Sequence, residues 1–149
     1  MAIVRCEKCG ALNRVADERT ADNPVCGRCK VRLDPSGAPQ PALGPALEQA
    51  IASSPVPVFI DFWAAWCGPC RVLAPAVEDL GRRQAGKLLI LKVDIDADPA
   101  AAKRYSVQAV PTLVLFQGGR EVARRTGVAP RSELESWVAE ATLGAGKVA

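Results

Sequence analysis

The chain has 149 residues, of which 49% are hydrophobic and 23% charged, and this balance predicts a folded protein of about one domain rather than a disordered one. It contains six cysteines and no histidine, which excludes the serine and cysteine hydrolases that use histidine as a base, and excludes metal sites with histidine ligands. The formal net charge of +3 is too small to indicate nucleic-acid binding by itself.

The six cysteines form three Cys-x-x-Cys pairs with none left over: Cys6/Cys9, Cys26/Cys29 and Cys67/Cys70. We find no apolar segment typical of a secretory signal at the N-terminus and no run of about 18 apolar residues that would span a membrane. We therefore expect no membrane association and an intracellular, reducing compartment. In such a reducing compartment, Cys-x-x-Cys pairs indicate metal sites or redox centres rather than structural disulfides.

Residues 1–34 hold the first four cysteines and few large apolar side chains, so we expect a metal ion to replace a hydrophobic core there. The two pairs are separated by 16 residues, a spacing typical of two zinc knuckles. Glycines in these pairs suit the tight turns of such knuckles. Four thiolates leave no open position on the ion, so we predict one structural Zn²⁺ held by Cys6, Cys9, Cys26 and Cys29.

Three alternatives stay open for this segment. A rubredoxin-like iron site would use the same four thiolates, and two disulfides would need an oxidising compartment. A nucleic-acid-binding ribbon would need positive charge and aromatic side chains. Residues 1–34 carry seven basic and five acidic side chains and no aromatic one, so we expect no nucleic-acid partner.

Three prolines and a glycine follow between Asp34 and Pro41, which predicts an extended linker. We place this linker at residues 35–44 and a second domain at residues 45–149. Apolar residues at helical spacing predict a short helix over 45–53, and the near-continuous apolar run at 56–63 predicts a buried strand.

The next segments alternate in the same way. Residues 70–84 predict a helix with Val72, Leu73, Val77 and Leu80 toward the core and a kink at Pro75, and residues 88–93 predict a second buried strand. Asp98 is a predicted N-cap for a helix that runs from Pro99 to Tyr105.

The last segments predict a hairpin and a helix. Strands at 112–116 and 121–126 flank the turn residues 117–120. A helix over 131–143 would bury Leu134, Trp137, Val138 and Ala141. The order of the elements predicts an α/β class, with a mixed central sheet and helices on both faces.

Cys67 and Cys70 lie where the first buried strand leads into a helix. Cys67, at the helix N-terminus, would meet free backbone N–H groups that stabilise a thiolate, so we expect it to be the nucleophile. Cys70 would then resolve a mixed disulfide on Cys67, and Pro69 would stiffen the turn. A zinc knuckle and an inert buried pair are the alternatives, and the strand-to-helix context favours the redox pair.

Asp61 is an acid inside the otherwise apolar run at 56–63. Burial should raise its pKa and allow it to exchange a proton with Cys70 near neutral pH. The alternative is a solvated residue at the edge of the sheet. Because the chain has no histidine, this carboxyl is the expected proton carrier.

The block from Asp61 to Arg71, DFWAAWCGPCR, resembles the active-site region of thioredoxins. Further matches follow in order along the chain: Pro75, Lys92-Val93-Asp94, Val110-Pro111-Thr112, Phe116-Gln117-Gly118-Gly119 and Thr126-Gly127. The resemblance implies a thioredoxin fold after the ribbon and a protein-disulfide reductase with Cys67 and Cys70 as catalytic residues. It also implies a pairing of Lys92 with Asp61.

The same resemblance implies a substrate groove beside the cysteines. Pro111 would be a cis-proline that faces the disulfide, and Val110 would offer backbone hydrogen bonds to a bound substrate strand. The remaining members of the groove would be Trp66, Gly68, Pro69, Gly127 and Val128.

A zinc ribbon ahead of such a domain resembles the thioredoxin 2 type, whose members are cytoplasmic bacterial proteins. This implies disulfide-containing protein substrates, an NADPH-dependent thioredoxin reductase as electron donor, no organic cofactor and a monomer. The prolines of residues 35–45 stand where thioredoxins often have an opening strand, so we expect that strand to be lost or very short. An isomerase or oxidant, and a redox-sensing binding protein built on the ribbon, are the alternative functions.

Overall fold

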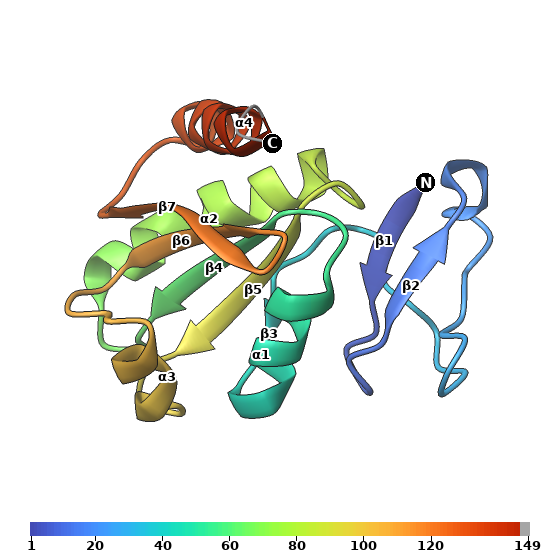
Figure 1. Cartoon of the computed structure of the whole chain (residues 1–149), viewed down its shortest axis with the longest axis horizontal. Helices are drawn as coiled ribbons and strands as arrows, with labels where there is room; N and C mark the ends of the chain where they lie inside the picture. Colours follow the sequence, from blue (N-terminus) through green and yellow to red (C-terminus); the bar gives the residue numbers. More distant parts are fainter. Residues whose placement is uncertain (147–149) are drawn as a thin grey trace.

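Two sheets organise the chain, and the computed structural model describes residues 1–146 of it (Figure 1). The smaller sheet is antiparallel and contains β1 (Ala2–Arg5) and β2 (Leu12–Val15). The larger sheet has the strand order β3-β5-β4-β6-β7. A larger sheet of five strands therefore follows a small N-terminal ribbon, as the sequence predicts.

The ribbon continues after β2 with a short 3-10 helix, η1 (Asp17–Arg19), and an isolated bridge between Val25 and Arg32. We expected this segment to have no apolar core. The structure corrects this, because a small buried cluster surrounds two of the cysteines: Ala2, Val4, Cys6, Val15, Cys26 and Leu33. These short side chains bury too little area to hold the segment without a further constraint.

The larger sheet is mixed in direction. Its strands are β3 (Gln40–Pro41), β4 (Val58–Trp63), β5 (Leu89–Asp94), β6 (Thr112–Gln117) and β7 (Arg120–Thr126). β3 and β4 both run parallel to β5, whereas β6 is antiparallel to β4 and to β7. Every residue of β4 except Trp63 is buried, which is why the sequence of this strand is almost continuously apolar.

Helices cover both faces of this sheet (Figure 1). The helices are α1 (Gly44–Ser53), α2 (Gly68–Arg83), α3 (Pro99–Arg104) and α4 (Arg131–Gly146). Side chains of α1 and α3 belong to the apolar cluster on one face, and those of α2 and α4 belong to the cluster on the other. In the described part of the chain, no helix has the length and apolar character needed to cross a membrane.

The opening strand is very short, as the prolines predicted. β3 has two residues, and they lie within residues 35–44, the segment that we expected to be a linker. Gln40 pairs with Leu91 and Pro41 pairs with Lys92 at the edge of the sheet. An edge strand tolerates Pro41 because its missing N–H removes no bond to a second neighbour.

Two details of α2 differ from the sequence prediction. The helix begins at Gly68 rather than at residue 70, with Cys67 as its N-cap. Val72 is 68% exposed, although we expected it to face the core. The buried stripe of this helix consists of Leu73, Val77 and Leu80. Val72 comes one residue before Leu73, and consecutive residues of a helix point about 100° apart, so its side chain faces away from the core. The expected end of the second domain at residue 149 lies outside the described residues.

The ribbon packs against the β3 and β5 edge of the larger sheet. The backbone N–H of Ile3 in β1 donates to the carbonyl oxygen of Gly86 at 3.1 Å. The approach is close, because a Cβ atom on Gly86 would lie 2.5 Å from Ala2 Cβ. Leu12 of β2 packs against the apolar cluster beneath α1. The ribbon is therefore a packed part of the molecule.

Gly81 lies in α2 where the helix passes the turn at Gly37. A Cβ atom on Gly81 would overlap the carbonyl oxygen of Gly37 and lie 3.3 Å from Ile90 Cδ1. Alanine stabilises an unconstrained helix by about 1 kcal/mol relative to glycine. Here we expect Gly81→Ala to lower the free energy of unfolding by about 1 to 3 kcal/mol, the usual cost of overpacking.

Urea denaturation followed by tryptophan fluorescence measures this effect. Glu78→Ala, at an exposed position of the same helix, is the control and should cost almost nothing. Equal or higher stability of Gly81→Ala would show that the two backbones do not approach as described.

Candidate functional site

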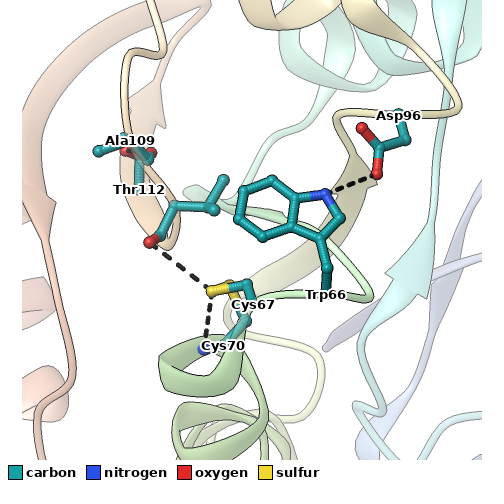
Figure 2. The surroundings of a disulfide bond; sticks show 7 residues. Trp66, Cys67, Cys70, Asp96, Ala109 and Thr112 are labelled. Atoms are coloured by element: carbon teal, nitrogen blue, oxygen red, sulfur yellow. Dashed lines mark hydrogen bonds between the residues drawn. A yellow bond between two sulfur atoms is a disulfide. The ribbon is translucent and has the colours of Figure 1, made fainter.

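A disulfide between Cys67 and Cys70 lies at the N-terminus of α2, directly after β4 (Figure 2). The two Cα atoms are 5.3 Å apart, and only 4% of Cys67 and 6% of Cys70 is exposed. Cys67 Sγ accepts a hydrogen bond from the backbone N–H of Cys70 at 3.1 Å. Because this N–H and the helix dipole favour negative charge, a reduced Cys67 is predisposed to be a thiolate.

The disulfide lies between an exposed indole and a loop (Figure 2). Trp66 is 64% exposed, and its Nε1 donates to Asp96 Oδ2 at 2.9 Å. On the other side, Cys67 Sγ lies 3.7 Å from the carbonyl oxygen of Val110. The Val110–Pro111 peptide bond is cis, as the resemblance implied.

The other residues of the predicted groove differ in how far solvent reaches them. Gly68 and Pro69 are exposed at the start of α2, Val128 is 47% exposed, and Gly127 is half-buried. The backbone N–H of Gly127 donates to the carbonyl oxygen of Pro111 at 3.1 Å. This bond joins the segment after β7 to the loop before β6. Sequence reasoning missed Asp96, because only the fold brings this surface acid to the indole of Trp66.

Asp61 lies in the middle of the larger sheet, where it is 2% exposed. Its Oδ1 atom is buried and accepts no hydrogen bond from the described residues. Lys92 is directly opposite in the β4–β5 register, and Lys92 Nζ lies 4.7 Å from the centre of the Trp63 ring. Burial raises the pKa of Asp61 from 3.8 to about 6, although the positive charge of Lys92 lowers it in part. The structure excludes a solvated position for this carboxyl.

The raised pKa of Asp61 makes stability depend on pH. Between about pH 4 and pH 6 the folded protein keeps a proton that the unfolded chain has released, so stability falls as pH rises through this window. The difference between the two pKa values corresponds to about 3 kcal/mol. We expect Asp61→Asn to be more stable than the wild type at pH 8 by up to about this amount, and of similar stability at pH 4.

Urea denaturation at the two pH values tests this expectation. Asp22→Asn, at an exposed position of the ribbon, should show no such dependence and serves as the control. A wild type more stable than Asp61→Asn at pH 8 would mean that the buried carboxylate is stabilised rather than strained.

The four cysteines of the ribbon come together in one cluster. Their Sγ atoms all lie within 4.8 Å of one another, with Cys6 to Cys29 and Cys9 to Cys26 each 3.6 Å apart. Four sulfurs placed about 2.3 Å from a tetrahedral ion lie about 3.8 Å from one another. The cluster therefore has the size and the donor set of a four-thiolate metal site.

Hydrogen bonds around Cys26 favour its thiolate. The backbone N–H of Cys29 is the main cause that lowers the pKa of Cys26, to about 6. The Asn13 side chain adds a contact from Nδ2 to Cys26 Sγ at 3.6 Å, while its Oδ1 accepts from the N–H of Gly27 at 2.9 Å. Asn13 therefore holds the second pair of cysteines in place, a role that the sequence analysis did not assign.

Known protein families match both parts of the chain. Residues 43–140 match the family model described as Thioredoxin, and residues 5–31 match the model described as Thioredoxin 2, N-terminal. Thioredoxin C-3 of Corynebacterium nephridii is 38% identical over 136 residues, which cover 91% of this chain and 92% of that protein.

Two further comparisons cover the second part of the chain. The bifunctional thioredoxin reductase/thioredoxin of Mycobacterium leprae is 42% identical over 84 residues, which cover 56% of this chain and 18% of that protein. The solved structure of a mutant thioredoxin from Halobacterium salinarum is 33% identical, with a TM-score of 0.66 over 73% of this chain and 95% of that one. The similarity therefore extends from sequence to fold.

Proposed function

Because this chain belongs to the thioredoxin family and is a thiol–disulfide oxidoreductase, we propose that it acts as a protein-disulfide reductase. One observation carries the proposal. Cys67 Sγ is the N-cap of α2, within reach of the Cys70 N–H and of the Val110 carbonyl oxygen. The sulfur that must attack a target thus lies between a group that stabilises its thiolate and a backbone edge that a target strand can pair with.

The proposed reaction transfers two electrons in two exchange steps. The Cys67 thiolate attacks one sulfur of a target disulfide, and the other target sulfur leaves as a thiolate. The Cys70 thiolate then attacks Cys67 Sγ, which forms the Cys67–Cys70 disulfide and releases the second target thiolate. The target is reduced to a dithiol, and the Cys67–Cys70 dithiol is oxidised to a disulfide.

Asp61 and Lys92 are proposed to handle the proton of the second step. Cys70 attacks only as a thiolate, so its proton must leave first. A carboxyl with a pKa of about 6 is a base of suitable strength near neutral pH, and burial gives Asp61 this pKa. Lys92, which lies opposite in the sheet, supplies a positive charge that favours the ionised form of Asp61.

The substrate groove is proposed to contain residues around Cys67, of which Val110 and Gly127 are half-buried and Pro111 is buried. Val110 and Pro111 would bind the backbone of a target strand, and Trp66, Gly127 and Val128 would contact its side chains. Support comes from the Val110 carbonyl oxygen, 3.7 Å from Cys67 Sγ, and from the bond between the Gly127 N–H and the Pro111 carbonyl oxygen. Trp66 and Val128 are both exposed. Gly68 and Pro69 leave the approach to Cys67 open, since a Cβ atom on Gly68 would meet nothing within 4 Å.

The ribbon is proposed to bind one structural Zn²⁺ through Cys6, Cys9, Cys26 and Cys29. When bound, the ion would join the two cysteine pairs and so add to the small apolar core of this segment. The same four sulfurs could bind iron. Metal analysis distinguishes the two: one zinc per chain and a colourless protein supports the proposal, and a coloured iron–thiolate protein overturns it.

The partners are proposed to be disulfide-containing proteins and an NADPH-dependent thioredoxin reductase. The Mycobacterium leprae relative supports the second partner, because its name joins both activities in one protein. This role requires a reducing compartment, and we propose the cytoplasm. We further propose that the chain works as a monomer and without nucleic acid.

Insulin reduction tests the proposed function. With dithiothreitol as the electron source, the protein should reduce the insulin disulfides and precipitate the free B chain much faster than dithiothreitol alone. A rate no faster than dithiothreitol alone would overturn the proposal.

A further inference from the structure

Arg5 and Gln40 form a buried reciprocal pair between the ribbon and the larger sheet. Arg5 Nη1 donates to Gln40 Oε1 at 2.9 Å, and Gln40 Nε2 donates back to the carbonyl oxygen of Arg5 at 3.0 Å. Arg5 is 5% exposed and Gln40 is 8% exposed. Arg5 Nε has no partner among the described residues, and breaking this pair would leave further buried polar groups unsatisfied, so the pair fixes Gln40 relative to β1.

Arg5 is also part of the surroundings of the four-cysteine cluster. It precedes Cys6 in the chain, and its Nη2 atom lies 3.7 Å from the position that a Cβ atom would take on Gly10. Cys6 follows Arg5 directly and Cys9 directly precedes Gly10, so thiolates at both positions would place negative charge near the guanidinium. Four thiolates around a divalent ion carry a net charge of about −2, which would attract this buried cation. A bound ion would therefore help to hold Arg5 in this position.

Gln40 holds a strand that has few bonds of its own. β3 consists only of Gln40 and Pro41, and Pro41 has no N–H to donate to the sheet. After β3, the N–H of Ala42 donates to the carbonyl oxygen of Lys92 at 3.1 Å, and the buried Ala42 side chain adds little area. The side-chain bonds of Gln40 are therefore a large share of what keeps β3 in place.

β3 lies beside the residues that surround Asp61. A surface pocket of about 390 Å³ is lined by Pro41, Leu43, Trp63, Lys92, Asp94 and Ala97. Lys92 pairs with Pro41 of β3 on one side and with Asp61 of β4 on the other. Displacement of β3 would therefore open Lys92, and the carboxyl of the neighbouring Asp61, to more water.

We propose that Arg5 and Gln40 are positioning residues for thiol–disulfide exchange: they hold β3 against the Lys92 side of Asp61, and they tie this position to the metal-bound fold of the ribbon. The proposal rests on the reductase function proposed above. It gives the ribbon a role in the chemistry of the Cys67–Cys70 centre, although the ribbon contributes no residue to that centre.

The surroundings of Asp61 predict in which direction its pKa changes when β3 moves. Among the described residues, β5 contributes Lys92, β6 places the apolar Leu113 opposite Asp61, and α2 contributes the Cys67–Cys70 pair, which titrates only when reduced. α4 covers this face with the apolar Leu134 and Val138. If β3 moves away, water reaches the carboxyl, burial is relieved and the pKa of Asp61 falls.

Gln40→Met tests the proposal, since methionine keeps the volume of glutamine and removes its hydrogen bonds. In the oxidised, metal-loaded full chain, a carboxyl-carbon NMR titration should show the Asp61 midpoint about one pH unit lower than in the wild type, a tenfold loss of proton affinity. Removal of the metal from the wild type with a chelator should lower the midpoint in the same direction. Gln49→Met, at an exposed position of α1, should leave it unchanged.

If Gln40→Met does not fold, a second variant and the removal of metal from the wild type still test the proposal. Gln40→Glu keeps an acceptor for Arg5, so its Asp61 midpoint should stay close to that of the wild type while metal is bound. An unchanged Asp61 midpoint in folded Gln40→Met, or after metal removal, overturns the proposal. Failure of the wild type to reduce insulin would overturn the reductase function instead, and the NMR titration would still report whether the ribbon controls Asp61.

Discussion

Cys67→Ser abolishes insulin reduction in our account, with a loss of about three orders of magnitude or more, as expected when a catalytic nucleophile is removed. The serine hydroxyl keeps the shape of the side chain. It cannot ionise near neutral pH, so the N–H of Cys70 has no thiolate to stabilise. The stability of the protein should change little, because the reduced wild type also lacks the Cys67–Cys70 bond. Initial rates of insulin precipitation measure the effect.

Cys70→Ser is the matched variant, and its expected behaviour differs in kind. Cys67 can still attack a target, but no second thiolate is available to release it, so the mixed disulfide should accumulate. Non-reducing electrophoresis with a disulfide-containing substrate would show the covalent complex. Ala65→Ser, at an exposed position two residues before Cys67, should keep full activity. Turnover by Cys67→Ser, or no complex with Cys70→Ser, would contradict the assigned roles.

Cys29→Ser should have the largest effect on the ribbon. Structural zinc sites contribute apparent free energies of about 10–16 kcal/mol near neutral pH, and a hydroxyl does not replace the thiolate. The cluster around Cys6 and Cys26 is too small to compensate. We therefore expect loss of the metal, release of residues 1–34 to limited proteolysis and a lower thermal midpoint. Metal content and cleavage by trypsin within the ribbon measure these changes.

The same variant should keep most of its chemistry. No ribbon residue contacts Cys67 or Cys70 in the hydrogen bonds of the described residues, so the insulin-reduction rate should stay within about tenfold of the wild type, the scale of the proposed change at Asp61. Lys30→Ala, next to Cys29 in the chain but exposed, should retain metal and stability. Full loss of activity with Cys29→Ser would show that the ribbon, and not the Cys67–Cys70 centre alone, carries the reaction.

Local patterns predicted the residues that carry the chemistry. The spacing of the first four cysteines predicted a common site, and their sulfurs lie within 4.8 Å of one another. The apolar flanks of Asp61 predicted a buried carboxyl, which the structure confirms. Asp98 caps α3 by accepting a hydrogen bond from the N–H of Ala101, as the Asp-Pro pair predicted. Each of these signals depends on residues that are close in the chain.

Features that depend on distant contacts were missed. The bond from Trp66 to Asp96 and the pair of Arg5 with Gln40 join segments about 30 residues apart or more, and an exposed or polar residue gives no sign of its distant partner.

Val72 was placed in the core because it is apolar, although its position on α2 faces solvent. The sequence also did not locate the short strand at Gln40 and Pro41, since only the β5 edge makes a strand of two residues.

The equilibrium of the Cys67–Cys70 pair with glutathione tests the central claim most directly. The fractions of dithiol and disulfide, measured over a series of reduced and oxidised glutathione ratios, give the reduction potential of the pair. We predict a value of about −270 mV, that of reducing thioredoxins. A value near about −120 mV would make the same two cysteines an oxidant and would contradict the reductase function.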